Sequence, residues 1–96
     1  MGPSVIEKRN LLLRYLNSYL SKKRLRMIDV VRSIKKRLTK YEPITERQFN
    51  AVVKFIEREK KFKGMDRLEI YIFFEPLFYP YNEKETLNDL TDFFVD

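Results

Sequence analysis

The sequence predicts one mainly helical domain with a small β element, and three observations support this fold class. Apolar residues recur every three or four positions over about 4–21, 26–39 and 45–63, which is typical of amphipathic helices. Residues 68–75 then change to a two-residue period, as in a strand. With 96 residues and 44% hydrophobic content, the chain can form one core but is too short for two.

The first two helices have clear sequence signals. Ser4 and Glu7 form an S-x-x-E capping-box pattern at the start of the first helix. An apolar stripe follows at helical spacing: Leu12, Leu13, Leu16, Tyr19 and Leu20. After a cluster of basic residues at 22–26, a second helix over about 26–39 is predicted by another stripe: Met27, Val30, Val31, Ile34 and Leu38.

The third helix is predicted to begin after Thr45. Thr45 and Gln48 make a T-x-x-Q capping box, while Ile44 and Phe49 stand at the hydrophobic-staple positions. Gly64 is expected just past the C-terminal end of this helix. Its apolar side consists of Phe49, Val52, Val53 and Ile56.

A strand is predicted next, at residues 68–75. One face is expected to be buried and holds Leu68, Ile70, Ile72 and Phe74. Pro76 ends the strand, and residues 77–82 are turn-like or form a return strand with Pro80 at the sheet edge. Residues 85–95 are compatible with a short terminal helix.

Charge is divided unequally along the chain. Residues 1–67 carry 19 Lys and Arg against seven acids, a net charge of +12, whereas residues 68–96 carry one Lys against seven acids, a net charge of −6. This asymmetry predicts a polyanionic partner for the basic part and a different role for the acidic end. We therefore distinguish a basic helical domain, 1–84, from an acidic segment, 85–96, which either acts separately or packs on the same core.

The composition argues against catalysis. The chain has no Cys and no His, which excludes thiolate or imidazole catalysis and ordinary transition-metal sites. Asp66 and Glu69 only faintly match a metal-dependent nuclease, because Tyr71 stands where the expected lysine would be. Gly2 and Gly64 are the only glycines, so no glycine-rich phosphate loop is present. We expect a non-enzymatic protein without cofactor or metal, located in the cytoplasm and not in a membrane.

Two of the predicted helices carry a basic side opposite their apolar stripe. At about 100° per residue, these sides gather the following cations: Arg32, Lys36 and Lys40 on the second helix, and Arg47, Lys54, Arg58 and Lys61 on the third. Such surfaces suit nucleic acid, since each neutralised phosphate releases condensed counterions. The alternative interpretation is an amphipathic helix that exposes its charges to solvent. The charge of residues 1–67 favours nucleic acid over a merely solvated surface. We expect the nucleic acid to be DNA rather than RNA.

Three helices, a short break between the second and third, and a following strand resemble the helix-turn-helix and winged-helix DNA-binding proteins over about residues 5–75. The resemblance implies that the third helix reads DNA with its first residues, Thr45, Arg47, Gln48 and Asn50. The connection TKYEP is longer than the tight turn of that family, and a second wing strand is missing. Abundant Glu, Lys and Arg are typical of thermophiles, so the resemblance extends to small replication or transcription accessory proteins of thermophilic archaea, their viruses and plasmids.

The C-terminal ETLNDLTDFFVD suggests an alternative function. Leu90, Phe93 and Phe94 have the spacing of the anchors in the peptide that replication proteins insert into a sliding clamp, and the segment resembles that peptide. The match is partial, because Leu87 stands where a glutamine is expected. The protein would then be an adaptor or small subunit of the replication machinery. Otherwise Leu87, Leu90 and Phe94 form the buried side of a terminal helix.

The aromatic run IYIFFEPLFYPY at 70–81 also has two interpretations. Aromatic rings beside basic residues can stack on the bases of a single strand. The rings left over from the core for this role would be Tyr71, Phe73, Tyr79 and Tyr81. A core role is favoured, because large aromatic side chains supply much of the buried area of a small domain.

Overall fold

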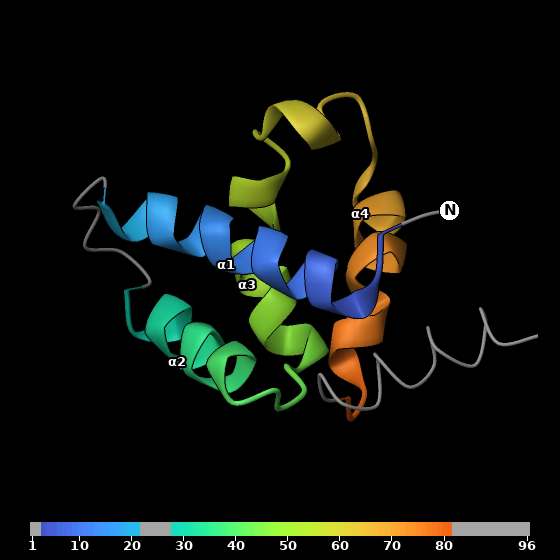
Figure 1. Ribbon diagram of the computed structural model, residues 1–96. Helices are drawn as coiled ribbons and strands as arrows, with labels where there is room; N and C mark the ends of the chain where they lie inside the picture. The colour runs from blue at the N-terminus through green and yellow to red at the C-terminus, as the bar shows by residue number, and fades with distance from the viewer. Residues whose placement is uncertain (1–2, 22–27, 82–96) are drawn as a thin grey trace, which may run out of the picture.

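The computed structural model describes residues 3–21 and 28–81, and every element within them is helical (Figure 1). In these residues four α-helices and two short 3-10 helices follow one another: α1 (Val5–Ser21), α2 (Ile28–Thr39), α3 (Glu46–Ile56), η1 (Lys60–Phe62), α4 (Arg67–Phe74) and η2 (Glu75–Phe78). The mainly helical class is confirmed. The small β element is wrong, since the described residues contain no strand. The helix expected at 85–95 lies outside them.

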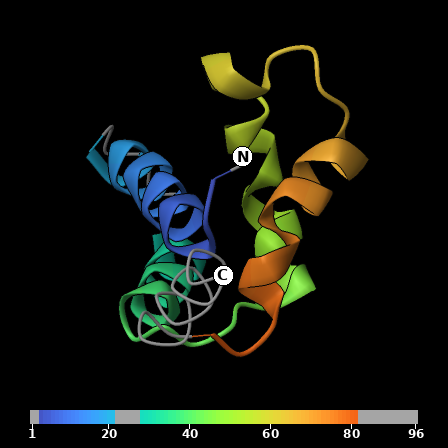
Figure 2. The ribbon, with the colours of Figure 1, turned by 45° about the vertical axis from the view of Figure 1, so that its right-hand side comes forward.

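Helix α1 contacts α2, α3 and η2. In Figures 1 and 2, α2 lies along one side of α1, and α3 and α4 lie side by side with η1 beyond their ends. The guanidinium of Arg9 in α1 donates a hydrogen bond from Nε to the carbonyl oxygen of Leu38 at 2.6 Å. This bond places a cation at the negative end of the α2 dipole and fixes α1 against α2.

Helix α2 ends in a Schellman motif that is built on a tyrosine. The Glu42 N–H donates to the Arg37 carbonyl oxygen at 2.9 Å, across the last turn. Tyr41 has a φ of 58°, in the left-handed region that usually favours glycine. Its ring lies 4.2 Å from the Arg9 guanidinium and 6.1 Å from the Tyr81 ring. These contacts offset the backbone cost and explain why a large side chain occupies the position.

The start of α3 agrees with the sequence prediction. Thr45 Oγ1 accepts from the Gln48 N–H, and Gln48 Oε1 accepts from the Thr45 N–H, both at 3.0 Å. Ile44 and Phe49 are both almost fully buried, as a hydrophobic staple requires. The Ile44 N–H also donates to the Leu77 carbonyl oxygen at 3.0 Å. The capping box is confirmed, and the segment before it is bonded to η2.

The end of α3 differs from the prediction. The helix stops at Ile56, and the chain turns into η1. A continuous helix would carry Phe62 roughly 130° away from the buried side of α3 and leave it exposed. The turn instead buries Phe62 to 1% exposure. Gly64, expected just past α3, follows η1 and has a φ of +90° that suits glycine.

The predicted strand at 68–75 is wrong, because residues 68–74 lie in α4 and Glu75 begins η2. Of the four residues expected on one buried face, Ile70 and Phe74 are fully buried, but Leu68 and Ile72 are 66% and 56% exposed. That pattern has a four-residue period and not a two-residue one. The return strand at 77–82 is also absent from the described residues, where η2 ends at Phe78.

A cap explains why these residues form a helix. Asp66 Oδ1 accepts from the Glu69 N–H at 2.8 Å, so Asp66 satisfies one of the unpaired N–H groups at the start of α4. Asp66 and Glu69 make a D-x-x-E pattern, a helix-start signal. The alternation was also incomplete, because Tyr71 and Phe73 at the outward positions are themselves largely apolar and half-buried.

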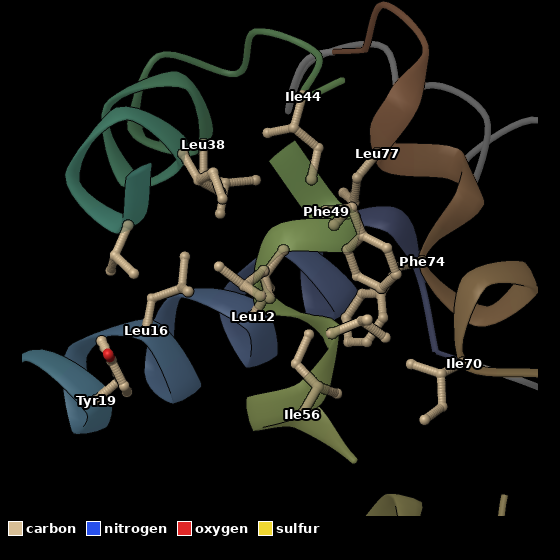
Figure 3. Close-up of a cluster of buried hydrophobic side chains, with 14 of the residues drawn as sticks. Leu12, Leu16, Tyr19, Leu38, Ile44, Phe49, Ile56, Ile70, Phe74 and Leu77 are labelled. Atoms are coloured by element: carbon tan, nitrogen blue, oxygen red, sulfur yellow. The ribbon is translucent and has the colours of Figure 1, made fainter. Parts of the chain in front are cut away.

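One aromatic and aliphatic core joins all the described helices (Figure 3). Phe74 of α4 lies 5.5 Å from Phe49 of α3 and 5.5 Å from Phe62 of η1, measured between ring centroids. Leu12 and Leu16 enter the same cluster from α1. Among the described residues no charged side chain is buried. The cations therefore lie at the surface, where their arrangement decides what the protein can bind.

Candidate nucleic-acid interface

A basic hollow lies where α2 approaches the C-terminal end of α1. Its volume is about 460 Å³, and Leu20 of α1 lines it together with four residues of α2 and the residue just after that helix: Arg32, Lys35, Lys36, Thr39 and Lys40. The structure thus brings together the three cations that the sequence assigned to this helix. None of the described residues lining the hollow is acidic. Cationic side chains therefore dominate its described lining, which favours an anionic ligand.

Lys35 belongs to this hollow and was missed by the sequence argument. It lies four residues from Val31, about 40° from the buried stripe of α2, and is half-buried. It also lies three residues after Arg32 and four before Thr39, so all three share one side of the helix. That spacing was the signal available in the sequence. The apolar stem of Lys35 can lie along the hollow wall while its ammonium reaches solvent.

The basic ridge of α3 consists of Arg47, Lys54 and Arg58, with the uncharged Asn50 on the same side, and all four are exposed. The residues on the opposite side of α3 are buried: Phe49, Val52, Val53 and Ile56. The ridge therefore points away from the core. Arg58 lies in the turn after α3, not within the helix. These residues do not line the α2 hollow, so the structure presents two separate basic surfaces.

Gln48 has a structural role at the junction of α2 and α3. Its Nε2 donates to Ser33 Oγ at 3.1 Å, and its Oε1 accepts from the Thr45 N–H. The Thr45 hydroxyl is likewise engaged with the Gln48 N–H. Of the four residues expected to read DNA, Gln48 and Thr45 thus form the cap, whereas Arg47 and Asn50 are exposed without such bonds.

Two acidic residues adjoin the ridge. Glu46 in the first turn of α3 accepts a hydrogen bond from the Tyr71 hydroxyl, and this bond raises the pKa of Tyr71 to about 12. Glu57 forms an ion pair with Arg67 of α4. Because Arg67 neutralises Glu57, Lys54 and Arg58 next to it keep their charge available for phosphates. Glu46 makes the start of α3 less favourable for phosphate than its C-terminal half.

Lys61 does not belong to the α3 ridge. It lies in η1, and its Nζ is 5.3 Å from the centroid of the Phe73 ring in α4. The assignment to one face with Lys54 and Arg58 assumed a helix that continues past Ile56. Since α3 ends there, the prediction of a shared face is wrong for Lys61.

The aromatic run offers little surface for base stacking. Tyr71 and Phe73 are half-buried, and Tyr81 is only 9% exposed. Burial raises the pKa of Tyr81 to about 12, and its hydroxyl has no hydrogen-bond partner in the described structure. Tyr79 alone among these four rings is largely exposed, at 58%. The core interpretation of the run therefore accounts for most of it.

The remaining sequence predictions concern the C-terminal anchors, the acidic residue Asp66, a metal ion and a membrane. The anchors Leu90, Phe93 and Phe94 lie outside the described residues. The carboxylate of Asp66 caps α4, which gives it a structural role. Within residues 3–21 and 28–81 no group of three acidic side chains could hold a metal ion. None of the helices in those ranges is long and apolar enough to cross a membrane.

Comparison with known protein families, with curated proteins and with solved structures finds no significant match to this chain.

Proposed function

We propose that the protein is a non-enzymatic, DNA-binding accessory or regulatory protein that contacts phosphates through α2 and α3. The observation that carries this proposal is the α2 hollow, in which four cationic side chains meet and which no acidic residue of ranges 3–21 and 28–81 lines. Repulsion among those cations is relieved when an anion binds between them. A DNA backbone supplies phosphates continuously along such a surface and releases counterions as it binds.

The α3 ridge extends this interface to a second surface. Lys54 and Arg58 suit phosphate contact, because their ammonium and guanidinium groups project from an exposed, convex side. Arg47 and Asn50, near the start of α3, have the side chains that most often contact guanine and adenine edges. Phosphate contacts would position the protein, and these two residues would supply any base preference.

The test is a titration of a duplex oligonucleotide at several salt concentrations, with variants that each lose two charges. Lys36→Gln with Lys40→Gln alters the α2 hollow, and Lys54→Gln with Arg58→Gln alters the α3 ridge. Lys60→Gln with Lys63→Gln is the matched control, because both lysines are exposed but lie in and beside η1. Single-stranded DNA and RNA of the same sequence are compared in parallel.

We expect each of the first two variants to lower the salt slope by up to about 0.9 per lost phosphate contact, with little change in the control. Melting curves of all three should match the wild type, since the substituted side chains are exposed. Equal slopes in all variants would show that net charge, and not these two surfaces, controls binding. Absence of duplex binding at low salt would rule out the proposed function.

The alternative function is an adaptor of the replication machinery that acts through Leu90, Phe93 and Phe94. Its support is the spacing of these residues in the acidic segment 85–96. Capture by a purified sliding clamp distinguishes the two functions. A clamp would capture an adaptor equally well whether the cations of the α2 hollow and the α3 ridge are present or replaced by glutamine.

A further inference from the structure

A second hollow, of about 270 Å³, lies between the N-terminal half of α1, η1 and α4. Three cationic side chains line it: Lys8 and Arg14 from α1, and Lys61 from η1. Phe73 of α4 also lines it, and Glu7 is the one acidic residue among the described residues that line it. This hollow is distinct from the α2 hollow and shares no residue with it.

Two ammonium groups converge on the Phe73 ring. The Nζ of Lys8 is 4.8 Å and the Nζ of Lys61 is 5.3 Å from the ring centroid. Neither lysine has an ion-pair partner among the described residues. The two charges are therefore held within about 10 Å of each other beside the Phe73 ring, and Glu7 is the one carboxylate among the described residues that line the same hollow. An anion placed between them would be attracted by both.

The core fixes the position of this ring. Phe73 packs edge-on against Phe62, with the centroids 5.2 Å apart and the planes at 72°, and Phe62 is 1% exposed. A rigid ring holds the two lysines close to a binding position before any ligand arrives, which lowers the entropy lost on binding. The site is assembled by the fold from residues far apart in the sequence.

Charge and size indicate the ligand. Three cations against one acid favour an anion with several negative charges over a single carboxylate, and the Arg14 guanidinium can bind two oxygens at once. At about 270 Å³ the hollow has room for more than a single water molecule. That space suits two linked phosphates and is too small for a double helix.

We propose that this hollow binds a pyrophosphate group, either free or as part of a nucleotide. Lys8, Lys61 and Arg14 contact the phosphate oxygens, and Phe73 is the positioning residue. The proposal does not rest on DNA binding. The hollow is formed by α1, η1 and α4, whereas Lys54 and Arg58 of the α3 ridge do not line it.

Isothermal titration of the full chain with sodium pyrophosphate, at constant ionic strength, tests the site. The variant is Lys8→Gln with Lys61→Gln, and the control is Lys60→Gln with Lys63→Gln, which loses the same charge from η1 and its flank but does not line the hollow. We expect saturable binding that is weakened about tenfold or more per lysine in the variant and less than about threefold in the control. Absence of saturable binding, or an equal loss in both proteins, would overturn the proposal.

Two further measurements define the mode of binding. Phe73→Leu keeps apolar bulk in the core but removes the ring quadrupole, and should weaken pyrophosphate binding by about two- to fivefold while the chain stays folded. ADP and adenosine distinguish the source of the group. ADP that binds more tightly than pyrophosphate identifies a nucleotide, and equal affinity identifies the free anion. Adenosine binding as tightly as ADP would contradict the proposed role of the phosphates.

Discussion

The side-chain amide of Gln48 in α3 donates to Ser33 Oγ in α2 at 3.1 Å. The same side chain closes the capping box of α3 through its Oε1. One residue therefore both starts α3 and fixes it against α2. Since these two helices carry the proposed DNA contacts, this pair contributes, together with the shared core, to the relative position of the α2 hollow and the α3 ridge.

We predict that Gln48→Ala lowers the free energy of unfolding by about 1–2 kcal/mol, because it loses a cap bond and the bond between helices. Ser33→Ala should cost about 0.5–1 kcal/mol, since it removes the bond between helices alone. Chemical denaturation measures both. A Gln48→Ala protein of wild-type stability that binds DNA more weakly would identify Gln48 as a DNA contact and not a structural residue.

Thr45→Ala should lower the free energy of unfolding by about 1 kcal/mol through the lost N-cap. Thr39→Ala is a matched control, because the Thr39 hydroxyl only bonds back to the Lys35 carbonyl within α2 and adds little stability. Thermal or denaturant unfolding compares the two. Equal stability of the two variants would mean that the capping bond of Thr45 is not maintained in solution.

The helical register of α4 can be tested by a pair of isoleucines. Ile70→Ala should cost about 2–5 kcal/mol because the side chain is fully buried, whereas Ile72→Ala at 56% exposure should cost less than about 1 kcal/mol. The strand first expected here would bury both, so the two costs would then be similar. Unfolding measurements on the two single variants therefore distinguish the helix from the strand.

Several parts of the fold follow directly from the sequence, because they depend on local bonds. The Thr45–Gln48 box and the apolar stripe of α3 were predicted correctly from residues within one or two turns. The end of α3 could not be predicted in this way, since the burial of Phe62 depends on the packing of α4 and α1 around it. The helix α4 could have been predicted from a local signal, the D-x-x-E cap that begins at Asp66. These residues were instead interpreted as a weak catalytic pattern.

The candidate sites, too, divide into features set by local helix geometry and features set by long-range packing. A helical projection finds Arg32, Lys36 and Lys40 on one side of α2, because that relation is set by helix geometry alone. A helical projection does not find that Lys8 and Lys61 converge on Phe73. These three residues lie on three different elements, which the core brings together. Lys61 was assigned to a DNA surface for the same reason: its position depends on where α3 ends.

Tyr81→Phe should leave the free energy of unfolding unchanged or raise it by up to about 1 kcal/mol, because the buried hydroxyl has no partner in the described structure. It should also alter the pH dependence. Burial raises the pKa of Tyr81 from 10.0 to about 12, so the unfolded chain loses this proton first, and stability falls as pH rises from 10 to 12. We expect a shallower fall in the variant. Identical pH profiles would contradict the shifted pKa.

The C-terminal phenylalanines can be distinguished from each other. If Leu87, Leu90 and Phe94 form the buried side of a helix, Phe93 lies about 100° from Phe94 on that helix and is less buried. We therefore predict that Phe94→Ala costs about 3–5 kcal/mol of stability and Phe93→Ala less than about 1 kcal/mol. A clamp-binding peptide would use both rings equally and would fold only on its partner. Two stable variants that both fail to bind a purified sliding clamp, when the wild type binds it, would favour the adaptor function over DNA binding.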